Sequence, residues 1–187
     1  MLVCTVIMAV EVHSQQEYVV QSSEFLVYRD GMVRVSYTIL AEETVSSITV
    51  PLLSSDAVNI LVLDEDDTPL NYMLVQSNFT VDTLGAVKVT VEYDTFELTR
   101  KDGAVWTLTV DVPSNATIYL PEQSSIVYIN EMPSRITVEN NEIILSLVKG
   151  RWEISYVLKP YQPDEFHPSF QFEYGYIVII AIAAVIA

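Results

Sequence analysis

Two stretches with the residue pattern of β-hairpins constrain the fold more than any other feature of the sequence. In "EFLVYRDGMVRVSYTI", alternating apolar runs flank Asp30-Gly31, and "FELTRKDGAVWTLTV" repeats this arrangement at Asp102-Gly103. An Asp-Gly pair between such runs is a strong hairpin signal, because the turn needs residues that accept positive φ. Alternation in a strand places every second side chain on one face. The apolar face after the first turn would carry Val33, Val35, Tyr37 and Ile39.

Most of the remaining chain is also strand-like. We predict further strands at 45–52, 58–63, 70–75, 86–93, 116–120, 125–129, 142–148 and 151–158. No stretch between residues 17 and 160 has sustained helical periodicity with caps. The predicted class is therefore all-β, with an antiparallel β-sandwich architecture.

Landmarks in the two halves of the chain follow the same order. A hairpin comes first, then a strand bounded by proline (Pro51 in one half, Pro113 and Pro121 in the other). A glycine-led strand ending in tyrosine follows, "GAVKVTVEY" and later "GRWEISY". The order suggests two tandem β-modules, residues 15–94 and 95–159, although one larger sandwich would also fit.

The charge balance excludes some partners. The 187 residues include 25 acidic and 9 basic side chains, for a net charge of −16. Binding nucleic acid or an anionic membrane surface needs basic patches, so we expect neither through this region. An acidic surface is also an ordinary way to keep an ectodomain soluble.

The N-terminal segment resembles a secretory signal. An apolar run from Leu2 to Val10 precedes Val12 and Ser14, as in a signal peptide with its cleavage site. We predict a signal at residues 1–14 and an exported form beginning near Gln15. The basic n-region is missing, so the alternative is a buried strand. The only cysteine, Cys4, lies in this segment, which leaves the mature chain without a disulfide.

The C-terminal segment changes character. Residues 160–175 combine prolines, acidic residues and aromatics, which predicts a stiff extended stalk. The apolar run that follows, 176–187, predicts the start of a transmembrane helix, with its 11 residues from Ile177 covering about half of a hydrocarbon core. Tyr174 and Tyr176 would lie at the headgroup level. This places residues 15–172 outside the cytoplasm of a single-pass membrane protein; the alternative for the tail is a buried strand.

Three positions are candidate sites. Asn78 and Asn115 begin Asn-X-Thr triplets and are predicted acceptors of N-linked sugar in an exported chain. The acidic cluster Asp64 to Asp67 provides oxygen atoms that calcium prefers. It lacks the glycine of known calcium loops, so we interpret it as a solvated turn and leave a cation site open.

Catalysis has little support in the sequence. After the predicted signal the chain contains one histidine, His167, which lies in the predicted stalk. Without cysteine, the usual Cys-His and metal constellations are excluded, and a Ser-His-Asp triad would require the stalk to fold back. Glycine is too scarce for a phosphate-binding loop. We therefore expect no catalytic residues, no metal and no cofactor. Trp106 and Trp152 are expected to pack in the sheets.

The pattern "LTRKDGAVWTLTVDVP…YLPEQSSIVYINEMP…EIILSLVKGRWEISYVL" resembles the ectodomains of archaeal membrane-bound regulators. The overall layout of signal, β-rich ectodomain, stalk and membrane helix is similar to that of archaeal cell-envelope proteins. The second resemblance implies a surface module anchored in the membrane. The first implies sensing outside the cell and DNA binding through a winged-helix domain that this chain does not contain.

These observations lead to two hypotheses for function. The first is a non-catalytic structural or interaction module at the cell surface, held by its C-terminal anchor and binding another envelope protein. The alternative is the sensor domain of a membrane-bound transcriptional regulator. No ligand pocket is visible in the sequence, which favours the first.

Overall fold

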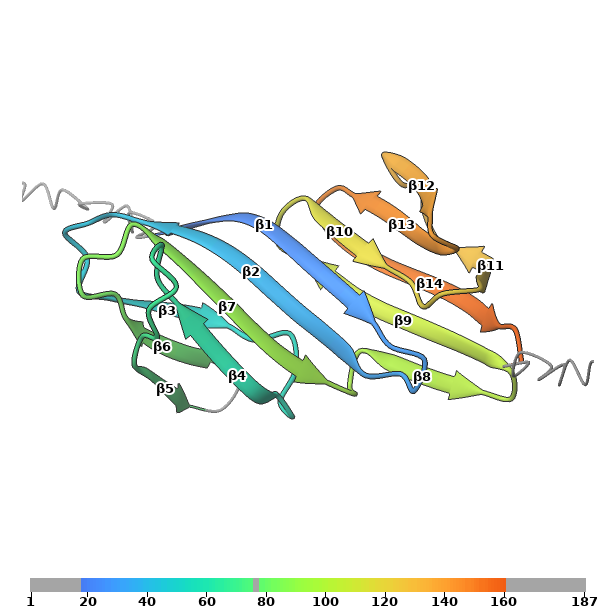
Figure 1. The fold of residues 1–187 in the computed structure, drawn as a ribbon, viewed down its shortest axis with the longest axis horizontal. Coiled ribbons are helices and arrows are strands. Elements are labelled where there is room, and N and C mark those ends of the chain that lie inside the picture. The colour runs from blue at the N-terminus through green and yellow to red at the C-terminus, as the bar shows by residue number, and fades with distance from the viewer. Residues whose placement is uncertain (1–17, 76–77, 161–187) are drawn as a thin grey trace, which may run out of the picture.

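The computed structural model describes residues 18–75 and 78–160, and these residues form fourteen strands and no helix (Figure 1). The strands of the first half are β1 (Tyr18–Val27), β2 (Val33–Ala41), β3 (Ser47–Pro51), β4 (Val58–Leu63), β5 (Tyr72–Val75), β6 (Asn78–Asp82) and β7 (Lys88–Thr95). Those of the second half are β8 (Thr99–Asp102), β9 (Val105–Val112), β10 (Ala116–Tyr119), β11 (Ser124–Ile129), β12 (Arg135–Glu139), β13 (Glu142–Leu147) and β14 (Gly150–Leu158). The all-β prediction is confirmed.

Several predictions concern residues outside this part of the chain. They are the signal at 1–14 with Cys4, the stalk at 160–175 with His167, of which only Pro160 is described, and the start of a transmembrane helix at 176–187. Within the described ranges, no helix is long and apolar enough to cross a membrane.

The strands form three sheets. The largest has seven strands in the order β12-β13-β10-β1-β2-β7-β4, and the others are β11-β14-β9-β8 and β3-β6-β5. Neighbours are antiparallel, as predicted, with one exception: β1 runs parallel to β10, from Ser23 opposite Ala116 to Leu26 opposite Tyr119. We call this pairing the β1·β10 joint. It makes one sheet out of strands from both halves of the chain.

The second seven strands repeat the pairing of the first seven. In the first half β1 pairs with β2, β7 with both β2 and β4, and β6 with both β3 and β5. Adding seven to each number gives β8·β9, β14 with β9 and β11, and β13 with β10 and β12, which are the pairs of the second half. We call the two halves unit 1 (β1–β7) and unit 2 (β8–β14). The division into modules 15–94 and 95–159 stays a prediction, since shared topology alone does not make each part an independent module.

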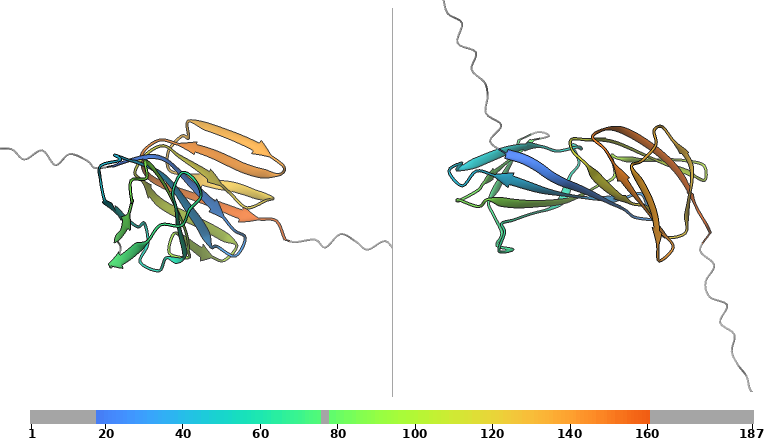
Figure 2. Two further views of the ribbon diagram at one scale, coloured as in Figure 1. Left: turned by 60° about the vertical axis from the view of Figure 1, so that its left-hand side comes forward. Right: turned by 90° about the horizontal axis from the view of Figure 1, so that it is seen from above.

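Both smaller sheets pack against the same face of the seven-stranded sheet (Figure 2). At the joint, Phe25 lies opposite Ile118, and both side chains are fully buried. In a paired register, opposite residues point to the same face, so the apolar faces of unit 1 and unit 2 are continuous. Buried side chains from both units accordingly form one hydrophobic cluster that contains Phe25, Tyr37, Phe79, Ile118 and Trp152.

Both predicted hairpins are present, and the first has the predicted apolar face. Val33, Val35, Tyr37 and Ile39 are all buried. The β1–β2 loop includes Asp30 and Gly31, with Gly31 at φ +90°. The second turn lies one residue later than predicted: Asp102 still pairs with Val105, so the two-residue loop is Gly103-Ala104, and Gly103 supplies the positive φ.

Two strands, β6 and β12, were not predicted. β6 contains the triplet at Asn78, and only Phe79 and Val81 give it an apolar face. β12 is an exposed edge strand with no buried residue. Each has five residues and only two alternating apolar side chains, which is a weak local signal.

Direct contacts also connect the hairpin of unit 1 to unit 2. A Cβ atom added to Gly31 would lie 2.2 Å from the ring of Trp106 on β9. The Thr99 hydroxyl donates a hydrogen bond to the Gly31 carbonyl. The turn of β1–β2 therefore fits against β8 and β9 only because residue 31 has no side chain.

Candidate functional site

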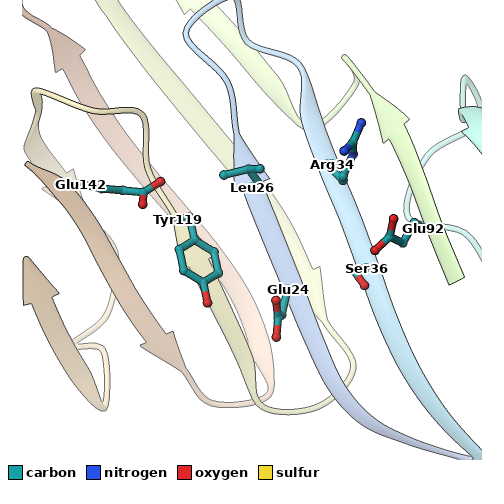
Figure 3. A pocket seen from close by; sticks show the side chains of 7 residues that line it. All are labelled: Glu24, Leu26, Arg34, Ser36, Glu92, Tyr119 and Glu142. Carbon is teal, nitrogen blue, oxygen red and sulfur yellow. The ribbon is translucent and has the colours of Figure 1, made fainter. Parts of the chain in front are cut away.

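A groove follows the β1·β10 joint on the outer face of the seven-stranded sheet, opposite the core. Its central hollow, about 290 Å³, is drawn in Figure 3. The lining comes from five consecutive strands of the sheet: Glu142 (β13), Tyr119 (β10), Glu24 and Leu26 (β1), Arg34 and Ser36 (β2), and Glu92 (β7). Two further hollows share residues with it, one through Glu24 and the other through Leu26 and Glu142. We call the three together the joint groove.

Alternation along each strand explains why polar side chains reach this face. Phe25 and Val27 point into the core, so Glu24 and Leu26 between and beside them point outward. The same holds for Arg34 and Ser36 beside the buried Val35 on β2. Figure 3 shows the labelled side chains projecting from one face of neighbouring strands. The groove is thus the polar side of the sheet at the place where unit 1 meets unit 2.

The middle of the groove is acidic. Burial raises the pKa of the Tyr119 phenol, and the carboxylates of Glu24, Glu142 and Glu139 raise it further. Burial, followed by repulsion from Glu122, raises the pKa of the Glu142 carboxyl. Both shifts have the same origin, since negative charge is concentrated where water is partly excluded. A bound cation or hydrogen-bond donor would relieve this repulsion.

Arg34, the basic residue of the central hollow, is already paired. Its Nε lies 2.9 Å from Oδ1 of the buried Asp94, and Nη2 donates to Oδ2 at 3.3 Å. Asn59 Nδ2 donates to the same Oδ2 at 3.0 Å. The hydrogen bond from Arg34 lowers the pKa of the Asp94 carboxyl, against the opposing effect of burial. This ion pair fixes the guanidinium, so the remaining charged groups of the hollow are the three glutamates.

The two ends of the groove differ in chemistry. At the end beside the start of β10, the hollow of about 400 Å³ is rich in hydroxyls and amides, including Ser22, Asn115, Thr117 and Ser134. At the other end, Arg29 donates to the backbone carbonyls of Glu122 and Lys159 at 2.9 and 3.0 Å. The groove therefore runs from a neutral hydroxyl end through an acidic centre to one arginine.

The side chains of the groove limit the chemical groups that it can offer. Between Tyr18 and Pro160 the sequence contains neither histidine nor cysteine, so the lining has no imidazole base and no thiol nucleophile. In the described part of the chain, no three His, Cys, Asp or Glu side chains are placed to hold a metal ion. What the lining offers is carboxylate, hydroxyl and amide groups for hydrogen bonds and ion pairs.

The sequence-predicted site residues lie on different elements, and only one borders the groove. Asn115 is exposed immediately before β10 and lines the hydroxyl end. Asn78 is exposed at the start of β6 in the three-stranded sheet. Both positions are open to solvent, and sugar attachment stays a prediction.

The acidic cluster forms the loop after β4. Asp64 Oδ1 accepts hydrogen bonds from the backbone N–H groups of Asp66 and Thr68 at 2.9 and 2.8 Å. Asp67 adopts φ +59°. One carboxylate thus closes the turn, while Glu65, Asp66 and Asp67 are exposed to water. This geometry agrees with the interpretation as a solvated turn.

The acidic lining of the joint groove was not predicted. Glu24 and Glu92 lie at outward positions of strands that the sequence predicts. The alternation of polar and apolar residues along these strands is the only local signal that could have located the two side chains on the outer face. Their proximity to Tyr119 and Glu142 depends on the parallel β1·β10 pair, whose partners are separated by about ninety residues in the sequence.

Comparisons with known proteins yield structural neighbours only. No family model matches the sequence, and no curated protein matches it. Solved structures that match include the M1 zinc metallopeptidase of Deinococcus radiodurans, at 12% identity and a TM-score of 0.46, covering 76% of this chain and 42% of that one. A variant of a two-domain M1 zinc metallopeptidase bound to L-arginine matches at 13% identity and a TM-score of 0.47, covering 76% and 43%. This chain spans less than half the length of those proteins.

Proposed function

We propose that this chain is the non-catalytic, extracytoplasmic β domain of a single-pass membrane protein and acts as a structural or interaction module at the cell surface. The observation that carries the proposal is the joint groove, whose lining offers carboxylates and hydroxyls for binding across both units. The apolar segments at both ends of the sequence support a location at the membrane.

The chemistry of the groove indicates the kind of partner. Glu24, Glu92 and Glu142 accept hydrogen bonds and attract positive charge. An extended segment of another envelope protein with lysine or arginine at its centre would satisfy these carboxylates. The net charge of −16 supports the same choice, because the field around the molecule attracts basic partners and repels nucleic acid.

A second candidate is the sensor domain of a membrane-bound regulator. The lining of the groove comes from β1, β2 and β7 of unit 1 and from β10 and β13 of unit 2. A ligand bound there would contact both units at once. It would then stabilise the joint relative to any state in which the units separate.

Location is tested by labelling with a membrane-impermeant maleimide in intact cells. In a Cys4→Ser background, Glu131→Cys places a thiol at an exposed position, and Leu145→Cys places one in the core. We expect the first variant to react in intact cells and the second only after unfolding. Reaction of Glu131→Cys only after lysis would place the domain in the cytoplasm and overturn the proposal.

The binding role is tested with a photo-reactive residue at Ser36, in the central hollow, and a matched one at the exposed Val87. An interaction module predicts an adduct between Ser36 variants and a second envelope protein in intact cells, and no such adduct from Val87. Adducts from both positions, or from Val87 alone, would contradict the groove as the binding surface. Correct location without any protein adduct would favour the sensor.

A further inference from the structure

Each unit contains a strand that corresponds to one partner of the β1·β10 joint but lacks a second neighbour in the described chain. Strand β8 holds the place in unit 2 that β1 holds in unit 1, and β3 holds the place in unit 1 that β10 holds in unit 2. Yet β8 pairs only with β9, and β3 only with β6. The two strands that join the units thus have counterparts whose outer edges have no strand beside them in the described chain.

The β3 edge matches the β10 edge residue by residue. "SSITVPLL" (46–53) aligns with "SNATIYLP" (114–121), which makes Thr49 the counterpart of Thr117 and Pro51 that of Tyr119. Burial follows the same alternation in both strands: Ile48 and Val50 are buried, as are Ala116 and Ile118. The two strands therefore present the same side to their cores.

The β8 edge corresponds to the β1 edge in the register of the sheets, but Lys101 is exposed where its counterpart Phe25 is buried. Tyr93 lies opposite Val35, which lies opposite Phe25. The corresponding chain of partners in unit 2 is Tyr156, Trp106 and Lys101. Thr99–Asp102 is thus the counterpart of Ser23–Leu26, the segment of β1 that forms the internal joint.

Backbone groups at both edges point in the direction that pairing requires. The Thr83 N–H donates to the Ser46 carbonyl. Backbone groups in an antiparallel pair point to alternate sides, so the even-numbered residues of β3 bond to β6, and the N–H and C=O of Thr49 point away from β6. Thr109 donates to the Leu98 carbonyl, so along β8 the even-numbered residues bond to β9 and Lys101 faces outward. An outward N–H and C=O on each edge are the groups a parallel ladder uses.

Charge favours contact between the two ends. Residues 35–87, which include β3 and most of unit 1, contain eight acidic residues and no lysine or arginine. Strand β8 carries the exposed Arg100 and Lys101 and also the exposed Asp102, so basic side chains outnumber acidic ones by one. The small positive excess of β8 favours contact with the acidic unit 1 of another copy over contact with a second β8.

We propose that copies of this chain associate head to tail through parallel pairing of β8 of one copy with β3 of the next, in the register of the internal joint. Arg100 would then lie opposite Thr49 of the next copy, as Glu24 lies opposite Thr117 within the molecule. The pairing would extend the four-stranded sheet by the three strands of the next copy. This inference does not depend on where the protein is located in the cell.

Pro51 sets the strength of this association. Tyr119, its counterpart in β10, has a backbone N–H at the joint, whereas proline has none. The contact between copies therefore lacks one hydrogen bond that the internal joint can form, and it is weaker and reversible. The opposite interpretation is that Pro51 and the charges of β8 keep both edges unpaired, as edge strands often are. That interpretation predicts monomers at every concentration.

Disulfide trapping on the full 187-residue chain tests the register. In a Cys4→Ser background, Thr49→Cys and Arg100→Cys are prepared as separate proteins and then mixed under mild oxidation. Neighbouring strands lie about 4.8 Å apart, which suits a disulfide between opposite residues. We expect a linked dimer in the mixture and little in either protein alone.

A matched control separates this contact from non-specific association. Met73 is exposed on β5, the opposite edge of the same three-stranded sheet, so mixing Met73→Cys with Arg100→Cys should give no dimer. No linked dimer from Thr49→Cys with Arg100→Cys, or an equal yield from the Met73→Cys mixture, would overturn the proposal.

Two proline variants test the mechanism by sedimentation velocity. Thr49→Pro removes an outward N–H that has no bond within the chain, so the fold should survive while association is lost. Pro51→Val restores the missing donor and should tighten association about fivefold. Unchanged sedimentation of both variants, with circular dichroism showing an intact sheet, would contradict pairing through β3.

Discussion

Single residues at the contact between the units show how closely the sequence fits the fold. Gly31 has a positive φ and also lies against Trp106, so two independent constraints exclude a side chain there. Gly85 has nearly the same φ, +92°, but its missing Cβ would meet nothing within 4 Å. Comparing substitutions at Gly31 and Gly85 therefore separates the cost of backbone strain from the cost of steric conflict with Trp106.

Replacing Gly31 by alanine should destabilise the protein more than replacing Gly85. Both changes carry the cost of positive φ for an L-residue, about 1–2 kcal/mol. Gly31→Ala adds overpacking against the indole, about 1–3 kcal/mol more. Urea denaturation of both variants measures the difference, and equal losses would show that Trp106 moves aside freely.

The ion pair below the groove predicts a pH dependence of stability. The Asp94 pKa is lowered in the folded state, so this carboxylate stabilises the fold above its unfolded pKa, about 3.9, and the contribution is lost as pH falls through the lower folded value. Asp94→Asn should cost about 1–3 kcal/mol at pH 7. The difference in urea midpoint between the native protein and Asp94→Asn should become smaller as the pH is lowered towards 3. A gap independent of pH would mean that the Asp94 charge does not contribute to stability.

Buried tyrosine hydroxyls offer a second pair of variants. The Tyr93 hydroxyl accepts a hydrogen bond from the backbone N–H of Leu53 at 3.1 Å, which ties the segment after β3 to β7. The Tyr156 hydroxyl is buried without a partner in the described chain, and burial raises its pKa to about 12. Tyr93→Phe should cost about 1–3 kcal/mol because Leu53 loses its acceptor.

Tyr156→Phe is the matched control, and its stability should stay within about 0.5 kcal/mol of the native value. Thermal unfolding of both variants distinguishes them. A larger loss for Tyr156→Phe than for Tyr93→Phe would show that the hydroxyl of Tyr156 has a partner, such as ordered water.

At the scale of elements, local pattern predicted the strands with a long apolar alternation and missed two short ones. β2 and β7 have a buried residue at every second position, and the sequence shows it directly. β6 and β12 have five residues each, and each alternation contains only two apolar side chains, Phe79 and Val81 in β6 and Ile136 and Val138 in β12. The groove could not be predicted from the sequence for a different reason. Glu24 and Tyr119 lie on neighbouring strands only because β1 and β10 pair in parallel, and no tight turn in the sequence marks a parallel pair.

At the scale of the whole molecule, one parallel pair determines the architecture. Without β1·β10 the chain would be two small sandwiches of identical topology; with it, they share a seven-stranded sheet and one core. The shared order of landmarks in the sequence, from hairpin to glycine-led strand, corresponds to the repeated order of strands. The register that joins the units is a long-range property that no short segment of sequence specifies.

Hydrogen exchange with single-residue resolution, on the dilute 187-residue chain, tests most directly whether the two units are fused into one sheet. Tyr28 bonds across the β1–β2 turn and Leu120 bonds to β13, and backbone groups point to alternate sides along a strand, so the backbone N–H groups of Phe25 and Tyr119 point into the joint. We expect these two amides to be protected as strongly as those of Val91 and Leu108 in the cores of the units. Thr49 and Lys101, at the counterpart positions of the open edges, should exchange much faster. Equally fast exchange at Phe25, Tyr119, Thr49 and Lys101 would show that the joint opens readily and that the units are separate domains.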